Sequence, residues 1–395
     1  MLAARLLDVL IVLILLVYVV VGYREGFLRT VGGLIGIAVG GVAVFFGIPL
    51  LVPLISEPFW RVVATIVVTV LLLALGHSVG YAVGRSVRRR FRARPLAIVD
   101  RIVGAITGLV VSALICSLVL GGLGALGAPL VSAAAGQSWV AGGITQLTPA
   151  PVQAGLARLR ALALENGLPR ITEALGGVAT SPGAPRVDTA SAALRAAAAS
   201  VVRINGTAYA CGQNQSGSGF AVAPDRIVTN AHVVAGVDQP VVEAPNGQAV
   251  QARVVYFDPD ADLAVLATTG LDVSALGLSR PMAVGDDGVV DGYPYGGPFT
   301  SGGARVLARS TELVDDIYGT GRNPREVYAL AATVRPGNSG GPLLTPAGQV
   351  AGVVFAQNAN DDELGYAMST ESLAPVVAQA ASRSAAVDPG RCTRG

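Results

Sequence analysis

The chain has 395 residues, of which 52% are hydrophobic and only 14% are charged, and its mean hydropathy is +0.58. Soluble globular proteins carry about 25% charged residues, so the composition excludes an entirely water-soluble chain and indicates that part of it lies in lipid. All 28 basic residues are Arg, which indicates a high-GC bacterial genome, and the net charge of +2 argues against a nucleic-acid-binding protein, since such domains carry a strong basic excess.

Four apolar stretches near the N-terminus are each long enough for a membrane-spanning helix, which needs about 20 apolar residues. They are residues 6–22, 31–55, 62–84 and 99–127. In the second and third, glycine recurs at every fourth position: Gly32, Gly36 and Gly40, then Gly76, Gly80 and Gly84. Small residues at this spacing let helix backbones approach closely in lipid, so we expect a packed four-helix membrane domain over residues 1–127.

The orientation of these helices follows from the Arg residues, which cluster in the loop over residues 85–94 between the third and fourth stretches. The positive-inside rule places such a loop in the cytoplasm. One crossing later, everything after about residue 128 lies outside. We therefore expect a multi-pass protein of the cytoplasmic membrane, in contact with lipid, whose C-terminal part is extracytoplasmic (periplasmic).

The first apolar stretch has polar features at both ends. Asp8 opens it, and it closes on the run Gly22-Tyr23-Arg24-Glu25-Gly26-Phe27. Together they resemble the colicin V production protein family, whose activity is too poorly defined to transfer. Asp8 and His77 are ionisable groups inside predicted spans, which makes them candidates for function. The alternative, which we favour, is that Asp8 lies near a membrane interface and His77 bonds a neighbouring helix.

Residues 128–186 are expected to connect the membrane domain to a soluble domain. Apolar residues recur there every three or four positions, at Val152, Leu156, Leu159 and Leu162, the spacing of a short amphipathic helix. Such a helix lies either on the membrane or against the soluble domain. The small and turn-forming residues 181–185 are typical of an exposed, flexible linker.

From residue 200 onward, short β-branched runs alternate with turns rich in Gly, Pro, Asn and Asp. The runs are residues 201–204, 219–222, 226–229, 252–255, 263–266, 305–307 and 350–354. Short strands at this spacing predict an all-β sandwich or barrel. We therefore expect an α-helical four-span membrane domain followed by an all-β domain, over residues 187–395, that is large enough for two small barrels.

One glycine-rich segment of the all-β domain surrounds a serine: Arg335-Pro336-Gly337-Asn338-Ser339-Gly340-Gly341-Pro342-Leu343. It is either an ordinary turn or the loop of a nucleophile whose backbone N–H groups surround a developing oxyanion. The second interpretation requires a base and an orienting acid. His232 follows a predicted strand and is the only His after the membrane domain, and Asp262 precedes the strand 263–266.

The order His232, Asp262, Ser339 is the chymotrypsin order. The motifs Thr-Asn-Ala-His-Val-Val, Asp-Leu-Ala-Val-Leu and Gly-Asn-Ser-Gly-Gly-Pro-Leu around these residues resemble the trypsin-like proteases in their bacterial HtrA-like form. With four spans before it, the chain is similar to the actinobacterial membrane-anchored serine proteases linked to acid resistance in mycobacteria. The resemblance implies a chymotrypsin-like double barrel and covers nearly the whole chain.

The resemblance, with the chemistry of these groups, implies a role for each residue. Ser339 attacks the scissile carbonyl, His232 transfers its proton, and Asp262 orients the imidazole. The backbone N–H groups of Gly337 and Ser339 form the oxyanion hole. Asp258 and Asp260 are rival acids, but Asp262 abuts the strand as in the family and is preferred. No cofactor and no metal are expected.

The substrate pocket is also placed by resemblance, with its floor at Thr333 and its wall at Phe355, Ala356 and Gln357. These residues carry no charge, so we expect a preference for uncharged substrate side chains. Asn338 stands where trypsin-like zymogens have the Asp that pairs with a new N-terminus, so that route of activation is not expected. About 55 residues follow Ser339, too few for the PDZ domain usual in HtrA-like proteins.

The three cysteines are Cys116, in an apolar stretch, and Cys211 and Cys392, which flank the all-β domain. In an exported domain we favour a disulfide between Cys211 and Cys392 over two buried thiols. It is expected to support the active state, in place of the missing ion pair.

Three functions compete. The first is a serine endopeptidase that cleaves envelope proteins or peptides, and that cuts itself within residues 176–186. The second is a transporter or channel whose protease-fold domain only regulates it, suggested by Asp8, His77 and the packed glycines. The third is an inactive protease fold used for binding, which the intact set of three residues disfavours. We expect the first, with a role in envelope stress or acid resistance.

Overall fold

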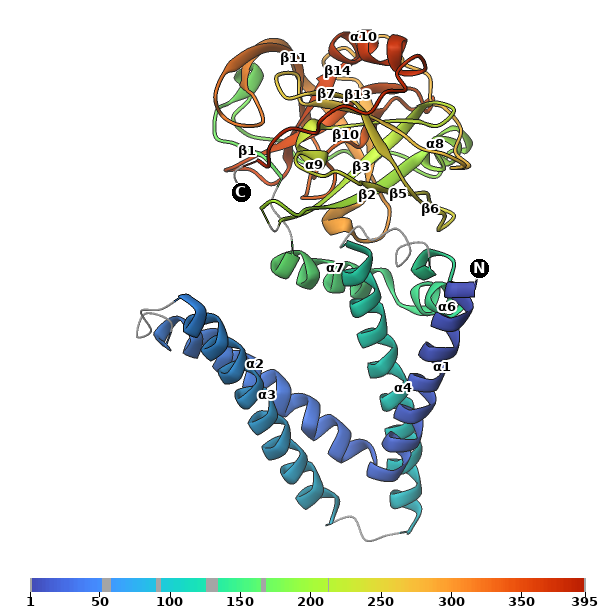
Figure 1. The fold of residues 1–395 in the computed structure, drawn as a ribbon, viewed down its shortest axis with the longest axis vertical. Helices are drawn as coiled ribbons and strands as arrows, with labels where there is room; N and C mark the ends of the chain where they lie inside the picture. The colour runs from blue at the N-terminus through green and yellow to red at the C-terminus, as the bar shows by residue number, and fades with distance from the viewer. Residues whose placement is uncertain are drawn as a thin grey trace. The chain divides into compact units, whose positions relative to one another are not determined.

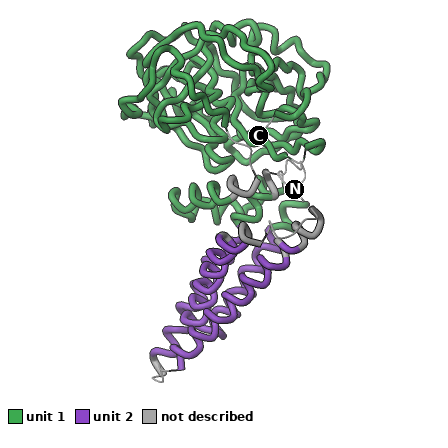
Figure 2. Tube along the Cα trace, turned by 90° about the vertical axis from the view of Figure 1, so that its left-hand side faces the viewer, with its two compact units in different colours: residues 1–7, 117–395 green, residues 8–116 purple. Residues whose placement is uncertain are grey.

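The computed structural model, drawn in Figure 1, describes residues 2–51, 58–89, 94–125, 134–164, 168–211 and 213–393. It divides into two compact units (Figure 2). Unit 1 consists of residues 1–7 and 117–395, and unit 2 consists of residues 8–116.

Unit 2 contains most of each apolar helix. These helices are α1 (Leu2–Glu25), α2 (Phe27–Leu51), α3 (Pro58–Arg88) and α4 (Arg94–Ala125). In the described part of the chain, four helical stretches are long and apolar enough to cross a membrane: Ala3–Glu25, Phe27–Val44, Val67–Arg88 and Leu96–Gly122. The four predicted apolar stretches are thus helical and long enough to span a membrane. The predicted ends of the second and fourth, and the domain boundary after residue 127, lie outside the described residues.

Helices α2 and α3 pack through their glycines. A Cβ atom added at Gly36 would collide with the carbonyl of Gly76, and one added at Gly80 would collide with the carbonyl of Gly32. The glycines spaced four residues apart therefore allow close packing of the two helices, as expected, since only residues without side chains let the two backbones approach this closely. The imidazole of His77 lies on the same face, against Gly33.

Polar groups join the helix ends near the motif that closes the first span. Asp100 of α4 accepts a hydrogen bond from the Leu28 N–H at the start of α2 (3.1 Å) and pairs with Arg88 of α3 (2.8 Å). Arg88 also donates to the carbonyl of Glu25 at the end of α1. Gly26, between α1 and α2, has φ +82°, a conformation in which a side chain would be strained and would collide with the Asp100 carboxylate. One carboxylate and one guanidinium thus hold all four helices together.

Unit 1 contains the connector elements α6 (Trp139–Leu147), α7 (Ala150–Leu164), β1 (Arg170–Ile171) and the 3-10 turn η2 (Leu175–Gly177). Helix α8 (Ala192–Ala198) follows the connector. Helix α7 is the predicted amphipathic helix. Its Ala157 is buried beside Gly297, and its Arg158 lies over the ring of Tyr295 at 5.7 Å. Of the two alternatives, packing against the β domain is therefore the one observed.

Two seven-stranded sheets form the rest of this unit (Figure 1). The first has the order β6-β5-β2-β3-β4-β8-β7, with β2 (Val201–Ala208), β3 (Gln213–Ala223), β4 (Arg226–Thr229), β5 (Val241–Glu243), β6 (Ala249–Gln251), β7 (Arg253–Asp258) and β8 (Leu263–Ala267). The second has the order β1-β13-β12-β9-β10-β11-β14, with β9 (Asp287–Gly292), β10 (Thr300–Asp315), β11 (Arg322–Ala331), β12 (Pro342–Leu344), β13 (Val350–Asn358) and β14 (Leu364–Ser369).

Pairing of β13 with β14 closes the second sheet into a barrel. Every pairing in the two sheets is antiparallel except that of β1 with β13. Six of the seven predicted strands lie within one observed strand each, the seventh (252–255) begins one residue before β7, and the double-barrel fold is confirmed. Short elements α9 (Ala231–Val234), η3 (Pro294–Gly296) and α10 (Thr370–Ala380) complete the domain.

The core between the sheets takes side chains from both. Phe220 and Leu263 of the first sheet and Leu344 of the second are fully buried in one cluster. Leu175 of the connector and Leu194 of α8 belong to the same cluster. Burying a Leu side chain stabilises a fold by roughly 1.5–3 kcal/mol, so the connector contributes to the stability of the β domain.

Candidate active site

Strand pairing brings two of the predicted catalytic residues together. His232 lies on α9, directly after β4, and Asp262 directly precedes β8. Because β4 and β8 are antiparallel neighbours, the end of one strand lies beside the start of the other. Ser339 comes from the second sheet, in the loop between β11 and β12. The candidate site therefore lies where the two sheets meet.

Asp262 holds His232 at three points. Its carboxylate oxygens lie 2.9 and 3.0 Å from His232 Nδ1, and Oδ1 also accepts the His232 backbone N–H at 3.0 Å. Asp262 has φ +54°, a left-handed conformation unusual outside glycine, and Asn230 fixes it by donating to its carbonyl (2.8 Å). Strain of this kind is concentrated at functional sites.

The two rival carboxylates are used differently. Asp258 accepts hydrogen bonds from the hydroxyl of Tyr256 and from the backbone of Asp260 and Ala261. Asp260 is engaged through its backbone carbonyl, which accepts from Arg325. In the part of the chain that the structure describes, only Asp262 contacts His232 through its carboxylate.

Glycines seat the Ser339 loop against the first sheet. Gly340 has φ +81°, and a Cβ atom there would collide with the carbonyl of Ser218 and the hydroxyl of Thr229. The Ser339 carbonyl accepts the Ser218 N–H at 2.8 Å, and the Ser218 hydroxyl donates to the Gly337 carbonyl at 2.7 Å. Only a residue without a side chain allows this close approach, which explains the glycines of the motif.

The nucleophile and the base share one cleft without bonding each other. Ser339 Oγ and His232 Nε2 are both buried, and neither has a hydrogen-bond partner among the described residues. The same residues supply no acceptor for the backbone N–H groups of Gly337 and Ser339. Catalytic hydrogen bonds often form only in the complex with substrate, so the arrangement is compatible with a resting site.

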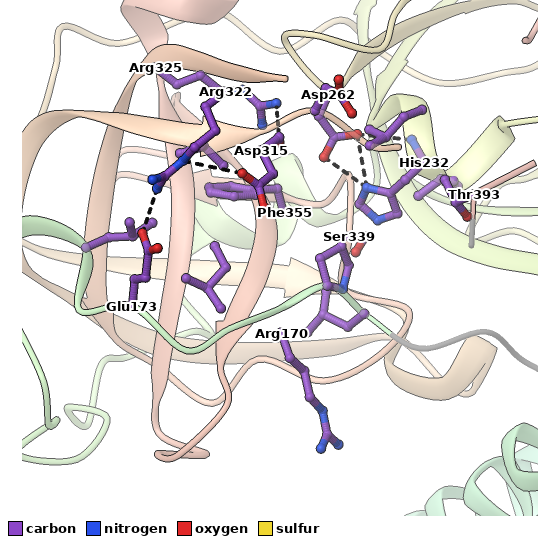
Figure 3. A pocket seen from close by; sticks show the side chains of 18 of the residues that line it. Arg170, Glu173, His232, Asp262, Asp315, Arg322, Arg325, Ser339, Phe355 and Thr393 are labelled. Atoms are coloured by element: carbon purple, nitrogen blue, oxygen red, sulfur yellow. Dashed lines mark hydrogen bonds and ion pairs between the residues drawn. The ribbon is translucent and has the colours of Figure 1, made fainter. Parts of the chain in front are cut away.

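The cleft holding these residues has a volume of about 600 Å³. Phe355, placed by the sequence in the wall of the substrate pocket, lines this cleft. Thr333 has an exposed side chain outside it, and Ala356 and Gln357 are buried without lining it. The cleft contains charged side chains that the sequence did not indicate: Arg170, Glu173, Asp315, Asp316, Arg322 and Arg325. In Figure 3 the Glu173–Arg322 pair lies across the cleft from His232 and Ser339.

Arg325 supports the loop that carries Asp262. Its guanidinium is buried and donates to the carbonyl of Asp260 (2.6 and 2.9 Å) and to that of Asp315 (2.9 Å). Burial lowers the pKa of Arg325, and the nearby Asp262 carboxylate opposes this. No local sequence pattern marks this residue, because its contacts join two loops far apart in the chain. Among the described residues, no group of three His, Cys, Asp or Glu side chains is arranged to hold a metal.

Asp291 is a second buried charge next to the Ser339 loop, and its carbonyl lies against Gly341. Burial raises the pKa of Asp291 to about 6, and the Ser301 hydroxyl partly opposes this. A raised carboxyl pKa means that the folded state holds the proton more tightly than the unfolded state. The stability contributed by protonation is therefore complete below about pH 4 and is lost as the pH rises through about 6.

We expect Asp291→Asn to remove this dependence and to raise the free energy of unfolding near pH 7 by up to about 3 kcal/mol, since each pKa unit corresponds to 1.36 kcal/mol. Melting temperatures of wild type and variant between pH 4 and 7.5 would check it. Asp272→Asn, at an exposed carboxylate, serves as the control. If the melting temperature of the wild type changed with pH in the same way as that of Asp291→Asn, the prediction would be contradicted.

Cys211 and Cys392 form a disulfide across 181 residues of sequence, whereas Cys116 is a buried free thiol. Thr393, next to Cys392, lines the cleft beside His232 (Figure 3). The bond thus ties the C-terminal segment to both the first sheet and the cleft. For a loop this long, the chain-entropy model gives roughly 5 kcal/mol of stabilisation as an upper figure.

We expect reduction of this disulfide to lower turnover while circular dichroism still shows a folded domain, because the bond holds a segment that borders the site. Turnover and circular dichroism would be followed together in reductant, well below the melting temperature. Cys116→Ser is the control and should respond as wild type does. A turnover that falls only as the fold melts would make the bond merely structural, and free thiols at Cys211 and Cys392 in exported protein would remove the premise.

Two known protein families match the chain. Residues 217–353 match the family described as trypsin-like peptidase domain, and residues 7–149 match the colicin V production protein family. Serine protease Rv3671c of Mycobacterium tuberculosis strain H37Rv is 36% identical over 256 residues, which cover 64% of this chain and 64% of that protein. Serine protease Do-like HtrB of Bacillus subtilis strain 168 is 34% identical over 162 residues, 39% of this chain and 35% of that protein.

Among solved structures, the active form of the Rv3671c protease matches with a TM-score of 0.52 at 35% identity. The match covers 57% of this chain and 99% of that one. The similarity thus extends over slightly less than two thirds of the full-length M. tuberculosis relative and over nearly all of its crystallised protease.

Proposed function

We propose that the chain is a membrane-anchored serine endopeptidase, since residues 217–353 match the trypsin-like peptidase domain and residues 7–149 match the colicin V production protein family. The observation that carries the proposal is the contact of the Asp262 carboxylate with His232 Nδ1, in the cleft that also contains Ser339. A carboxylate on one imidazole nitrogen leaves the other free to accept a proton from a nucleophile.

In the proposed reaction, Ser339 Oγ attacks the carbonyl carbon of a peptide bond while His232 Nε2 takes its proton. Asp262 keeps the imidazole in the required tautomer and stabilises the imidazolium. The N–H groups of Gly337 and Ser339 stabilise the negative charge on the carbonyl oxygen. His232 then donates its proton to the leaving amine, and water releases the acyl group from Ser339 by the same steps.

A fluorophosphonate probe tests this proposal in the full-length protein in detergent. Ser339 should form a covalent adduct, located by mass spectrometry, because the probe reacts with serines activated by a neighbouring base. If circular dichroism shows a folded protein and no adduct forms on Ser339, a binding or regulatory role for the domain would be favoured.

The setting of the reaction is also part of the proposal. Four apolar helices and the Arg-rich loop at residues 85–94 support a protease domain outside the cytoplasmic membrane, where proteins and peptides of the envelope would be substrates. We further propose a role in envelope stress or acid resistance, which rests on the resemblance of motifs and spans. Survival at acidic pH of a strain carrying Ser339→Ala in place of wild type tests it, and equal survival would contradict it.

The linker before the domain suggests self-cleavage. Gly177, Ala179, Thr180 and Pro182 are exposed and small or turn-forming, as at favoured sites of proteolysis. We expect wild-type cells to contain a soluble fragment cut within residues 176–186, and cells with Ser339→Ala to contain only the full-length membrane protein. Immunoblots of the soluble and membrane fractions measure this. Equal amounts of fragment in both would assign the cut to another protease.

A further inference from the structure

A short piece of the connector lies in the candidate active-site cleft. Residues 168–173 and Leu175 line it together with His232, Asp262 and Ser339. Within this piece β1 runs parallel to the end of β13, with Arg170 opposite Gln357 and Ile171 opposite Asn358. The Gln357 N–H donates to the Pro169 carbonyl at 3.2 Å, and the Ala359 N–H donates to the Ile171 carbonyl at 2.9 Å. The connector thus occupies a sheet edge by adding a strand, which is one of the ways proteins bind extended peptides.

Side chains fix this piece at both ends. Leu168 is 6% exposed and packs in the apolar cluster of the second barrel, and Leu175 is 4% exposed in the core between the sheets. Between them, Glu173 forms an ion pair with Arg322 at 2.6 Å, and its carbonyl accepts a hydrogen bond from the Tyr366 hydroxyl. The contacts are those of a bound ligand, with two apolar anchors around an extended backbone.

The reacting atoms are covered in this arrangement. Ser339 Oγ and His232 Nε2 are both inaccessible to solvent. Attack requires a substrate carbonyl within about 3–3.5 Å of the nucleophile, so some part of the cleft wall must move before a peptide can react. The wall includes Gln215 and Ser216 of β3, Thr393 beside the disulfide, and the connector. Gln215 and Ser216 are paired with β2, and the neighbour of Thr393 is covalently tied. The connector is paired with β13 over only two residues, whereas β3 is paired with β2 over eight, so we expect the connector rather than β3 to move.

We propose that residues 168–175 are an inhibitory segment, an internal ligand that competes with peptide substrates for the cleft. This rests on the proposed function. The segment escapes cleavage at its paired residues, because the carbonyls of Pro169 and Ile171 accept hydrogen bonds from β13 and are not offered to Ser339. Since it is tethered, its effective concentration is in the millimolar range expected for short linkers, and weak contacts suffice to exclude substrate.

The position of the segment also explains how inhibition would end. Residues 176–186, of which Gly177, Ala179, Thr180 and Pro182 are exposed and residues 183–185 are half-buried, join the segment to α8 and β2. A cut there leaves the segment on the membrane part of the chain and separates it from the catalytic domain, so that the segment is no longer tethered directly to the strand that follows it. Cleavage of the linker would then activate the protease as well as release it from the membrane.

Leu168→Asp tests the proposal in the full-length protein in detergent, because a charge cannot stay in the apolar cluster and the segment should detach. The control is Ala174→Asp, which adds the same charge to the same segment at an exposed position outside the cleft lining. We expect the fluorophosphonate probe to label Leu168→Asp about tenfold faster than wild type or more, as a shift from a mostly closed to a mostly open population requires. Ala174→Asp should label as wild type does.

Two further measurements separate detachment from misfolding. Hydrogen exchange at the Gln357 and Ala359 amides should be slow in wild type and fast in Leu168→Asp, with the rest of the protease core still protected. A synthetic peptide of residues 168–175, added to Leu168→Asp, should slow its labelling again, whereas a scrambled peptide should not.

The outcomes distinguish this inference from the proposed function. Equal labelling of wild type and Leu168→Asp, with the two amides deprotected in the variant, would overturn the inhibitory segment and leave the protease intact. Failure of the added peptide to slow labelling would also overturn it. Absence of labelling in every variant, including one shown to be folded and deprotected at both amides, would instead overturn the proposed function.

Discussion

Ser339→Ala is expected to reduce the turnover of a peptide substrate by about four to six orders of magnitude, with the protein still folded. The reason is that the variant loses the only atom that can form the acyl-enzyme, while the methyl group left behind fits the same loop. Backbone contacts hold that loop: the Ser339 carbonyl to the Ser218 N–H, and the Gly340 N–H to the Val354 carbonyl. Neither contact involves the hydroxyl.

Turnover would be measured with full-length protein in detergent, after release of the inhibitory segment by Leu168→Asp so that the starting activity is high. Ser382→Ala, at an exposed hydroxyl beyond α10, is the matched control and should retain full activity. Circular dichroism would verify the fold of each. Turnover of Ser339→Ala within tenfold of its parent would refute the assignment of the nucleophile.

Asp262→Asn is expected to reduce turnover by about four orders of magnitude, as an amide in place of the orienting carboxylate favours the wrong tautomer of the base. The Asn side chain can donate to His232 Nδ1, which then presents its proton on Nε2 toward Ser339. An imidazole in that state cannot accept the serine proton. The geometry should otherwise persist, because the Asn230 side chain still donates to the backbone carbonyl at this position.

The neighbouring carboxylates supply internal controls. Asp258→Asn and Asp260→Asn make the same chemical change four and two residues away, respectively, at side chains that do not contact His232 in the described structure. Each should keep turnover within about tenfold of wild type. The pH dependence of turnover below pH 8 would show whether the base is altered. A larger loss in Asp258→Asn than in Asp262→Asn would reassign the orienting acid.

Features that depend on neighbours in sequence could be predicted from the sequence alone. The spans follow from uninterrupted apolar runs, the packing of α2 on α3 follows from glycines four residues apart, and the seven strands follow from β-branched runs between turns. The motifs around His232, Asp262 and Ser339 were recognisable because each of these residues lies in a short segment whose backbone conformation restricts the neighbouring residue types. The left-handed conformation at position 340, for example, requires glycine.

The tertiary structure decided the features that depend on which distant segments meet. β1 has only two residues and no periodicity, so nothing local marks it as a strand, and pairing with β13 alone defines it. The charges of the cleft arise in the same way, since Glu173 and Arg322 are ordinary surface residues until the fold places them 2.6 Å apart. Burial, which raises the pKa of Asp291 and lowers that of Arg325, is likewise a property of the packed sheets. Sequence patterns report local conformation and the apolar face of each element, whereas a binding cleft is made from side chains whose proximity only the completed packing determines.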